Sequence, residues 1–266
     1  MALAPVHRPG EPGDIQLTDP DALDEGAGRM SFLEHLEELR KRIINALISL
    51  IAGVIVGFFF LERVVSFVLT PLRARLPEGS AFMATEAPEY FILYIKVGLL
   101  VGLFIAMPLI LWQVWLFIAP GLYSHEKRFA IPFVVLASLF FFLGAAFAHY
   151  VAFPWTWQFF IDFTDPNVVL MPKLQPTFAL YVRVVLAFGA IFQLPTLVFF
   201  LARMGVITAR FMIVYFKYAV LIIFILAAVL SPGGDIPSQL LMAGPMLVLY
   251  GLSIGIAWAF GKRKPA

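Results

Sequence analysis

The sequence predicts an all-α membrane protein with six transmembrane helices, and three observations support this fold class. Apolar residues make up 61% of the chain, whereas soluble domains usually contain roughly 45 to 50%. Charged residues make up only 14%, so no single core could bury the apolar excess. A helix needs about 20 mostly apolar residues to cross a bilayer. Six runs near that length cover roughly residues 43–61, 92–118, 131–153, 179–202, 213–230 and 239–260.

The composition also excludes several classes of function. The chain has no cysteine, which rules out disulfides, thiolate catalysis and cysteine-bound metals. Lys and Arg stand singly or in triplets beside apolar runs, a pattern that orients helices and does not bind nucleic acid. The pair His125-Glu126 would need a histidine at 129 for a zinc protease motif, but Phe129 stands there. No nucleotide or hydrolase motif occurs, so we expect no cofactor, no metal and no enzymatic activity.

The first 28 residues predict a disordered acidic tail in the cytoplasm. They are rich in Pro, Gly and acidic residues and lack the apolar core of a cleaved signal peptide. The membrane domain is expected to cover residues 29–261, and residues 262–266 form a basic cytoplasmic tail.

The distribution of Lys and Arg predicts the orientation, because cytoplasmic loops carry the excess of positive charge. With both termini in the cytoplasm, the inner charges are Arg40, Lys41, Arg42, Lys127, Arg128, Arg203, Arg210, Lys262, Arg263 and Lys264. The outer charges are then only Arg63, Arg73, Arg75 and Lys173. The two longest loops, 62–91 and 154–178, face outward, and their prolines predict ordered caps.

Local motifs refine the individual elements. The connection Ser231 to Pro237 is too short for anything except a hairpin, so the fifth and sixth spans must be neighbours. Ser31 with Glu34 forms a capping-box pattern, and Ser124 is a candidate N-cap of the third span. Pairs of glycines four residues apart would allow close helix contacts. They are Gly53 with Gly57, Gly98 with Gly102, and Gly251 with Gly255.

Polar side chains near the predicted cytoplasmic face are the first candidates for a site. Glu34 and Glu38 lie one turn apart on an amphipathic lead-in, although Glu38 could simply pair with Arg42. Glu126 lies in the short loop before the third span, where it could complement the helix dipole. Either carboxylate therefore has a structural explanation as well as a functional one.

The spans themselves carry almost no ionisable groups. Gln193, beside Pro195, could form an interhelical hydrogen bond or contact another subunit. Asp235 is expected to cap the sixth span before Pro237, and Gln239 could be structural or contact a partner. Lys217 lies near a span end, from which it can reach the interface.

Four segments together resemble the TatC family, subunits of the twin-arginine protein translocase. They are FLEHLEELRKR (32–42), WQVWLFIAPGLYSHEKR (112–128), FQLP (192–195) and SPGGDIPSQ (231–239), in the family's order. The resemblance runs from about residue 30 to 260 and agrees with six spans and two cytoplasmic termini. It implies a concave bundle that exports folded proteins with the proton motive force. The Arg-poor, acidic N-terminal stretch is unlike a transit peptide, so we expect the bacterial inner membrane.

The resemblance also implies roles for individual residues. Glu38 and Glu126 match the carboxylates that hold the two arginines of a signal peptide, because a carboxylate grips a guanidinium bidentately. The expected partners are signal peptides of folded cargo, TatA and TatB (or one bifunctional TatA-type subunit), lipid and further copies of the chain. The motif positions next to this site are Arg40, Phe117, Lys127 and Arg128. The residues expected to contact the TatA-type and TatB-type partners are Gln193 and Gln239. Motif positions in the outer loops are Pro71, Thr85, Glu86 and Asp235.

Two departures and two alternatives qualify this interpretation. The family often has glutamate where this chain has Gln193, and Pro-Pro-Asp where it has Pro-Gly-Gly-Asp. A secondary transporter or channel for a small solute would require charged or broken helices at the bilayer midplane. An intramembrane protease would require a buried nucleophile with a base, and neither Ser138 nor His149 has an obvious companion in the sequence.

Overall fold

The computed structural model describes residues 32–76, 80–119, 130–165, 170–231 and 235–261. Contacts divide the chain into two units, Met1–Arg40 and Lys41–Ala266. Of the first unit, the described part is the N-terminal stretch of helix α2 (Phe32–Phe58). The predicted acidic and basic tails lie outside the described residues, as do the predicted N-caps Ser31 and Ser124.

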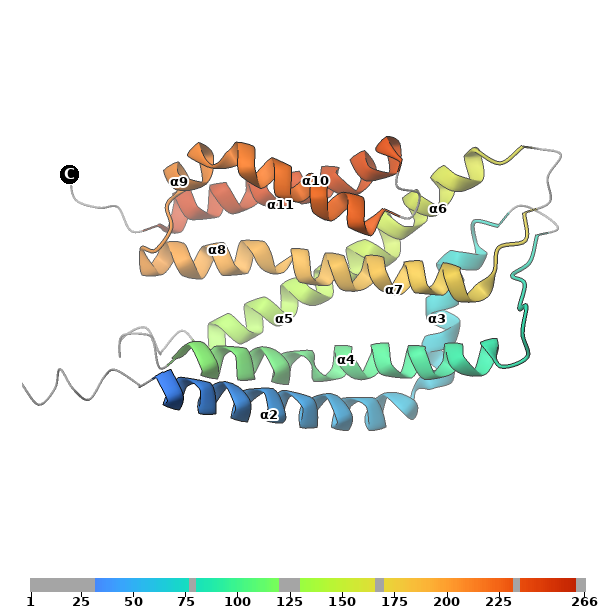
Figure 1. The fold of residues 1–266 in the computed structure, drawn as a ribbon, viewed down its shortest axis with the longest axis horizontal. Coiled ribbons are helices and arrows are strands. Elements are labelled where there is room, and N and C mark those ends of the chain that lie inside the picture. Colours follow the sequence, from blue (N-terminus) through green and yellow to red (C-terminus); the bar gives the residue numbers. More distant parts are fainter. Residues whose placement is uncertain (1–31, 77–79, 120–129, 166–169, 232–234, 262–266) are drawn as a thin grey trace, which may run out of the picture. The chain divides into compact units, whose positions relative to one another are not determined.

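Helices fill nearly all of the described part of the second unit (Figure 1). After α2 come α3 (Leu61–Arg73), α4 (Glu89–Ile118), α5 (Ala130–Phe147), the π-helix η3 (Ala148–Ala152) and α6 (Phe153–Asp162). They are followed by α7 (Leu174–Ile191), α8 (Gln193–Met204), α9 (Ala209–Val214), α10 (Phe216–Leu230) and α11 (Ile236–Phe260). The predicted all-α fold class is confirmed.

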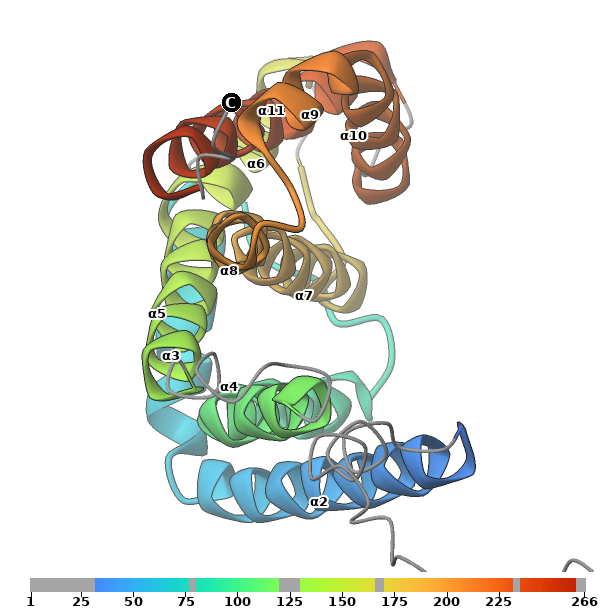
Figure 2. The ribbon, with the colours of Figure 1, turned by 90° about the vertical axis from the view of Figure 1, so that its left-hand side faces the viewer.

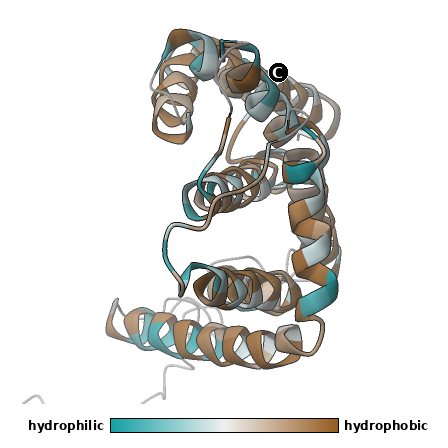
Figure 3. Ribbon diagram, turned by 90° about the vertical axis from the view of Figure 1, so that its right-hand side faces the viewer, coloured by the Kyte–Doolittle hydropathy of each residue, from teal (hydrophilic) through white to brown (hydrophobic). Residues whose placement is uncertain are grey.

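Five helical segments of the described residues are long and apolar enough to cross a membrane, and α10 is shorter. They correspond to five of the six predicted spans, although the third continues through η3 and α6 to Asp162. Large apolar side chains point outward along these segments and along α10, for example Ile51, Ile55, Leu221 and Val229, each at least 55% exposed. The ribbon in Figure 3, coloured by hydropathy, shows that hydrophobic residues predominate along the helices. Lipid is the medium that such a surface requires.

Within the second unit, α5 runs along one side of the helical array when it is seen end on (Figure 2). It contacts α4, α7 and α8, and α11 contacts α8, α9 and α10. The prediction that the last two spans are neighbours is therefore confirmed. The main core lies between α3, α4, η3, α6, α7 and α11, and its largest fully buried side chains include Phe153, Phe178 and Phe188.

Two glycine pairs bring α2 and α4 into close contact. A Cβ on Gly53 or on Gly102 would overlap backbone atoms of the other helix, at Gly102 and Val54 respectively. A Cβ on Gly57 would lie 3.1 Å from the amide nitrogen of Gly102. The two predicted small-residue motifs thus pack on each other inside one chain. The third motif differs, because a Cβ on Gly251 or Gly255 would meet nothing within 4 Å.

The two long loops are ordered where the structure describes them, as the sequence predicts. Met83 forms a parallel β-bridge with Lys173, supported by hydrogen bonds from Met83 N–H to Pro172 O (3.0 Å) and from Leu174 N–H to Met83 O (3.1 Å). We call this end of the second unit the paired-loop end. Helix α3 covers the first part of one loop, and α6 covers the first part of the other.

Two prolines interrupt the long helices. Pro154 has no N–H for the carbonyl four residues before it, and the helix widens into η3, where Phe153 N–H donates to Ala148 O. Pro195 likewise leaves the carbonyl of Ile191 without its helical partner, and α7 ends at that residue before α8 begins at Gln193. A polar side chain lies close to each interruption, His149 in η3 and Gln193 at the start of α8.

Candidate functional site

The structure describes only some of the residues of the predicted signal-peptide site. Glu38 and Arg40 lie on α2 in the first unit, where Glu38 is half-buried and Arg40 is exposed. Glu34 and Glu37, on the preceding turn, are exposed. Glu126, Lys127 and Arg128 lie outside the described residues, so the predicted pairing of Glu38 with Glu126 at one site stays a prediction.

The end of α4 that leads into the undescribed loop is firmly held in the second unit. Trp115 is 3% exposed and packs against Phe133 of α5 and Phe200 of α8, with ring centroids 4.9 and 5.7 Å apart. Phe117, a predicted site residue, is half-buried in the last turn of α4. Arg42 of α2 donates to the Gln113 side chain of α4 at 3.5 Å. These contacts hold the end of α4 against α2, α5 and α8.

The two predicted partner-contact residues both make intramolecular hydrogen bonds. The Gln193 amide donates to Ala137 O of α5 (3.0 Å) and, more weakly, to Gly189 O (3.4 Å). The Gln239 amide of α11 donates to Phe224 O of α10 (2.7 Å). The interhelical hydrogen bond expected for Gln193 is therefore confirmed. A contact of either glutamine with another subunit stays a prediction.

Two of the predicted outer-loop residues, Asp235 and Thr85, form hydrogen bonds that stabilise the local fold. Asp235 caps α11, because its carboxylate accepts from Ser238 N–H at 2.8 Å. This hydrogen bond lowers the pKa of Asp235 below its ordinary value. Glu86 is exposed, and it is the neighbouring Glu89 whose carboxylate accepts from Thr85 N–H at 3.0 Å. Pro71 is half-buried inside α3.

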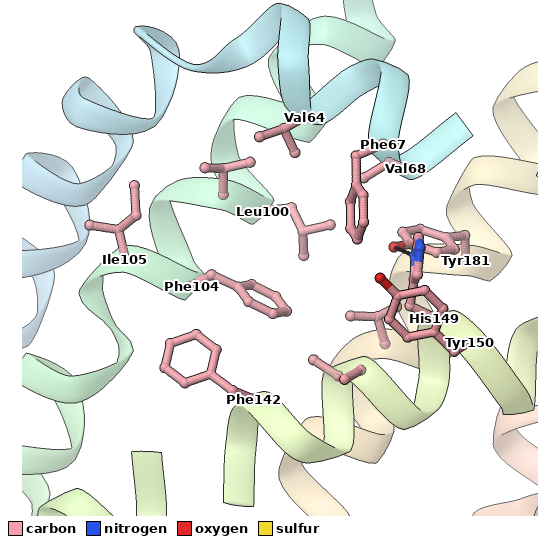
Figure 4. Close-up of a pocket in the computed structure, with 14 residues that line it drawn as sticks. Val64, Phe67, Val68, Leu100, Phe104, Ile105, Phe142, His149, Tyr150 and Tyr181 are labelled. Atoms are coloured by element: carbon pink, nitrogen blue, oxygen red, sulfur yellow. Dashed lines mark hydrogen bonds between the residues drawn. The ribbon is translucent and has the colours of Figure 1, made fainter. Parts of the chain in front are cut away.

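A buried histidine lies beside a cavity that the sequence did not predict (Figure 4). The cavity has a volume of about 450 Å³ between α3, α4, α5, η3 and α7, and its lining is almost wholly apolar. His149 Nδ1 lies 2.8 Å from the Tyr181 hydroxyl, and Phe67 stacks on the imidazole with centroids 4.3 Å apart. This hydrogen bond could not be read from the sequence, and a tyrosine is not the nucleophile that a protease would require beside His149. Its partner comes from α7, 32 residues later in the chain.

Two basic residues, Lys96 and Arg183, lie inside the predicted spans. Lys96 lies within α4, where it donates to the Gln175 side chain of α7 at 2.6 Å. Arg183 is the single charged residue of α7 and is exposed. The expectation of almost no ionisable groups in the spans is wrong at these positions. A lone cation in an apolar run such as LYVRVVLAF was visible in the sequence and is informative in a membrane helix.

Comparison with known proteins relates this geometry to a family. The model of the Sec-independent protein translocase protein (TatC) family matches residues 34–245. The TatC protein of Desulforapulum autotrophicum is 39% identical over 233 residues, which cover 88% of this chain and 86% of the relative. The TatC protein of Koribacter versatilis is 38% identical over 232 residues, 86% of this chain and 85% of the relative.

A solved structure agrees with the fold. The crystal structure of the twin-arginine translocase receptor TatC superposes with a TM-score of 0.74 at 35% sequence identity. The match covers 84% of this chain and 97% of that one. The apolar spans, the motif order and the fold lead to one conclusion: the chain belongs to the TatC family of Sec-independent protein translocase subunits.

Proposed function

We propose that this inner-membrane subunit of the twin-arginine translocase is the receptor that binds the twin-arginine signal peptide of folded cargo proteins. The observation that carries the proposal is the family match over residues 34–245, which includes both Glu38 and Glu126. The solved relative with this fold is itself described as a translocase receptor. TatC proteins are translocase subunits and not enzymes, so the task of this chain is binding.

The chemistry of the proposed site follows from its residue types. Each carboxylate can accept two parallel N–H bonds from a guanidinium, whereas a lysine ammonium cannot form that fork. Two carboxylates would therefore select paired arginines over paired lysines. Arg40, Phe117, Lys127 and Arg128 would border the site, and TatA-type and TatB-type subunits would be recruited after the signal peptide binds. The proton motive force would supply the energy.

Transport of a small solute is the competing function. Arg183 and the helix break at Phe192 are features that this alternative requires. The relatives favour the translocase, because those reported above are all Sec-independent translocase proteins that match over most of their length.

Peptide binding to the purified protein in detergent tests the proposal. A fluorescent signal peptide with Arg-Arg should bind about tenfold or more tightly than its Lys-Lys twin, a difference of about 1.4 kcal/mol or more. Glu38→Gln and Glu126→Gln should each remove most of that preference. Glu37→Gln, one position away on the exposed part of α2, is the matched control and should keep it. Equal binding of the two peptides to the unmodified protein would refute the receptor assignment.

A further inference from the structure

We infer that the cavity beside His149 binds one acyl chain of a membrane phospholipid, and that the Nε2–H group of His149 donates a hydrogen bond to the ester carbonyl of that lipid (Figure 4). The cavity lies between α3, α4, α5, η3 and α7 and has a volume of about 450 Å³. We call it the His149 cavity. The inference goes beyond the proposed function and does not rest on it, because it concerns lipid and not the signal peptide.

The imidazole of His149 has one nitrogen without a partner in the described part of the chain. The Tyr181 hydroxyl has no other acceptor among the described residues, so it donates to Nδ1 at 2.8 Å and the ring proton lies on Nε2. His149 is only 5% exposed, and it lines the cavity. The fully buried, unpartnered side-chain atoms of the described residues belong to Ser138, Trp157 and Thr196, so Nε2 is reachable from the cavity. An N–H group in hydrocarbon is costly until an acceptor reaches it.

The His149 cavity opens to the lipid-facing surface of the second unit. Phe67, Ile105, Phe142 and Tyr150 line the cavity, and each is at least 40% exposed. In Figure 4, Ile105 and Phe142 lie at one end of the cavity, and His149 and Tyr150 lie at the other. The cavity therefore has an apolar end and a polar end, as a site for a lipid chain with an ester group requires.

The depth of the cavity matches one leaflet of the bilayer. Helix α4 has 30 residues and is about 45 Å long, close to the thickness of a bilayer with its headgroups. The first turns of α4 and α7 are level at the paired-loop end, because the Gln175 amide donates to Glu89 O at 3.1 Å. Tyr181 lies about 10 Å along α7 from this level, near the edge of the hydrocarbon layer. Ile105 lies about 24 Å along α4, near the midplane.

The cavity is too narrow for a helix and fits an extended chain. Over the distance of about 14 Å between these two depths, its volume corresponds to a cross-section of about 30 Å², whereas a helix with side chains covers about 80 Å² or more. Hydrocarbon already surrounds the protein, so burial of one more chain gains little from the hydrophobic effect. Packing against the aromatic lining and the hydrogen bond to Nε2 are therefore what hold one lipid in preference to its neighbours.

Photocrosslinking in lipid tests this inference. The full chain is placed in phosphatidylcholine nanodiscs with a small fraction of phosphatidylcholine that carries a diazirine in the middle of one chain, and mass spectrometry locates the crosslinks. They should concentrate on Phe104 and Phe142 of the cavity, relative to the exposed Leu221 of α10. Ala146→Phe, which fills the cavity from an exposed position, should reduce them to the level at Leu221. Ala190→Phe, exposed on α7 and outside the lining, is the matched control and should keep them.

An ether-linked phosphatidylcholine with the same diazirine chain tests the hydrogen bond, because it lacks the ester carbonyl. The ester probe should crosslink in the cavity about fivefold more than the ether probe, a difference of about 1 kcal/mol. His149→Phe should remove this difference, and circular dichroism in detergent verifies that the variant keeps its helices. Tyr150→Phe, an exposed position at the same end of the cavity, should retain the difference.

Four results would overturn the inference. Equal crosslinking of Phe142 and Leu221 would mean that no lipid chain is held and would leave the cavity to a segment of a partner protein. Crosslinks that persist in Ala146→Phe would place the chain outside the cavity. Equal crosslinking by the ester and ether probes in the unmodified protein, or a difference that Tyr150→Phe abolishes, would remove the hydrogen bond to His149. None of these measurements uses a signal peptide, so a failure of the receptor assignment would appear only in the signal-peptide assay.

Discussion

The buried pair His149 and Tyr181 ties two spans together through one hydrogen bond. Both side chains are at most 5% exposed, and the imidazole is covered by Phe67. Removing one partner leaves the other polar group buried and unsatisfied, which costs about 1 to 3 kcal/mol. We therefore expect Tyr181→Phe and His149→Phe each to lower the free energy of unfolding by that amount, measured by denaturing titration in detergent.

The double variant separates this hydrogen bond from simple loss of packing. With both polar groups replaced, no buried donor or acceptor remains, so the two single effects should not add. Tyr181→Phe combined with His149→Phe should be clearly more stable than the sum of the single changes predicts. Additive losses would mean that the 2.8 Å contact contributes nothing of its own.

The Gln193 side chain links two neighbouring helices by hydrogen bonds within the apolar spans. At the junction of α7 and α8, the Gln193 side chain donates to Ala137 O of α5 and to Gly189 O of α7. An amide has the donor that these carbonyls require, and a glutamate carboxylate does not. The residue that departs from the family is thus the one suited to this local geometry.

At the scale of elements, the packing of α2 on α4 depends on glycine. A side chain at Gly102 would overlap Val54, so Gly102→Leu must push the two helices apart. Overpacking of this kind costs about 1 to 3 kcal/mol. We expect Gly102→Leu to lower the free energy of unfolding by that amount and to expose the α2 face, which proteolysis near the N-terminus would detect.

Gly251 provides the matched control on α11. A Cβ there meets nothing within 4 Å in the described part of the chain, and alanine favours a helix over glycine by about 0.5 to 1 kcal/mol. Gly251→Ala should therefore be neutral or slightly stabilising. Similar changes in the free energy of unfolding for Gly102→Leu and Gly251→Ala would contradict the close contact between α2 and α4.

At the scale of the whole molecule, the sequence predicts the spans well and the contacts between them poorly. Length and hydropathy are local properties, so runs such as 92–118 and 239–260 correspond closely to α4 and α11. The motif around Asp235 is also local, and its capping role is confirmed. The partner of His149 lies in a distant helix, and the partner of the Gly53 motif lies in the next span. Spacing along the chain cannot reveal either.

Whether the chain crosses the membrane six times depends on α9 and α10. Helix α10 alone is shorter than the other spans, but α9 and α10 are separated only by Tyr215. Together they rise by about 33 Å from Ala209 to Leu230, which is enough for the hydrocarbon layer of about 30 Å. We therefore expect residues 206 and 236 to lie on opposite sides of the membrane.

Single cysteines can test this topology directly, because the chain has none of its own. Val206 and Ile236 are good positions, since they are 64% and 72% exposed. In intact spheroplasts, a membrane-impermeant maleimide should label Ile236→Cys, whereas Val206→Cys should react only after permeabilisation. Labelling of both cysteines from the same side would mean that α9 and α10 do not cross. The C-terminus would then lie opposite to the cytoplasmic position that the Lys and Arg distribution predicts.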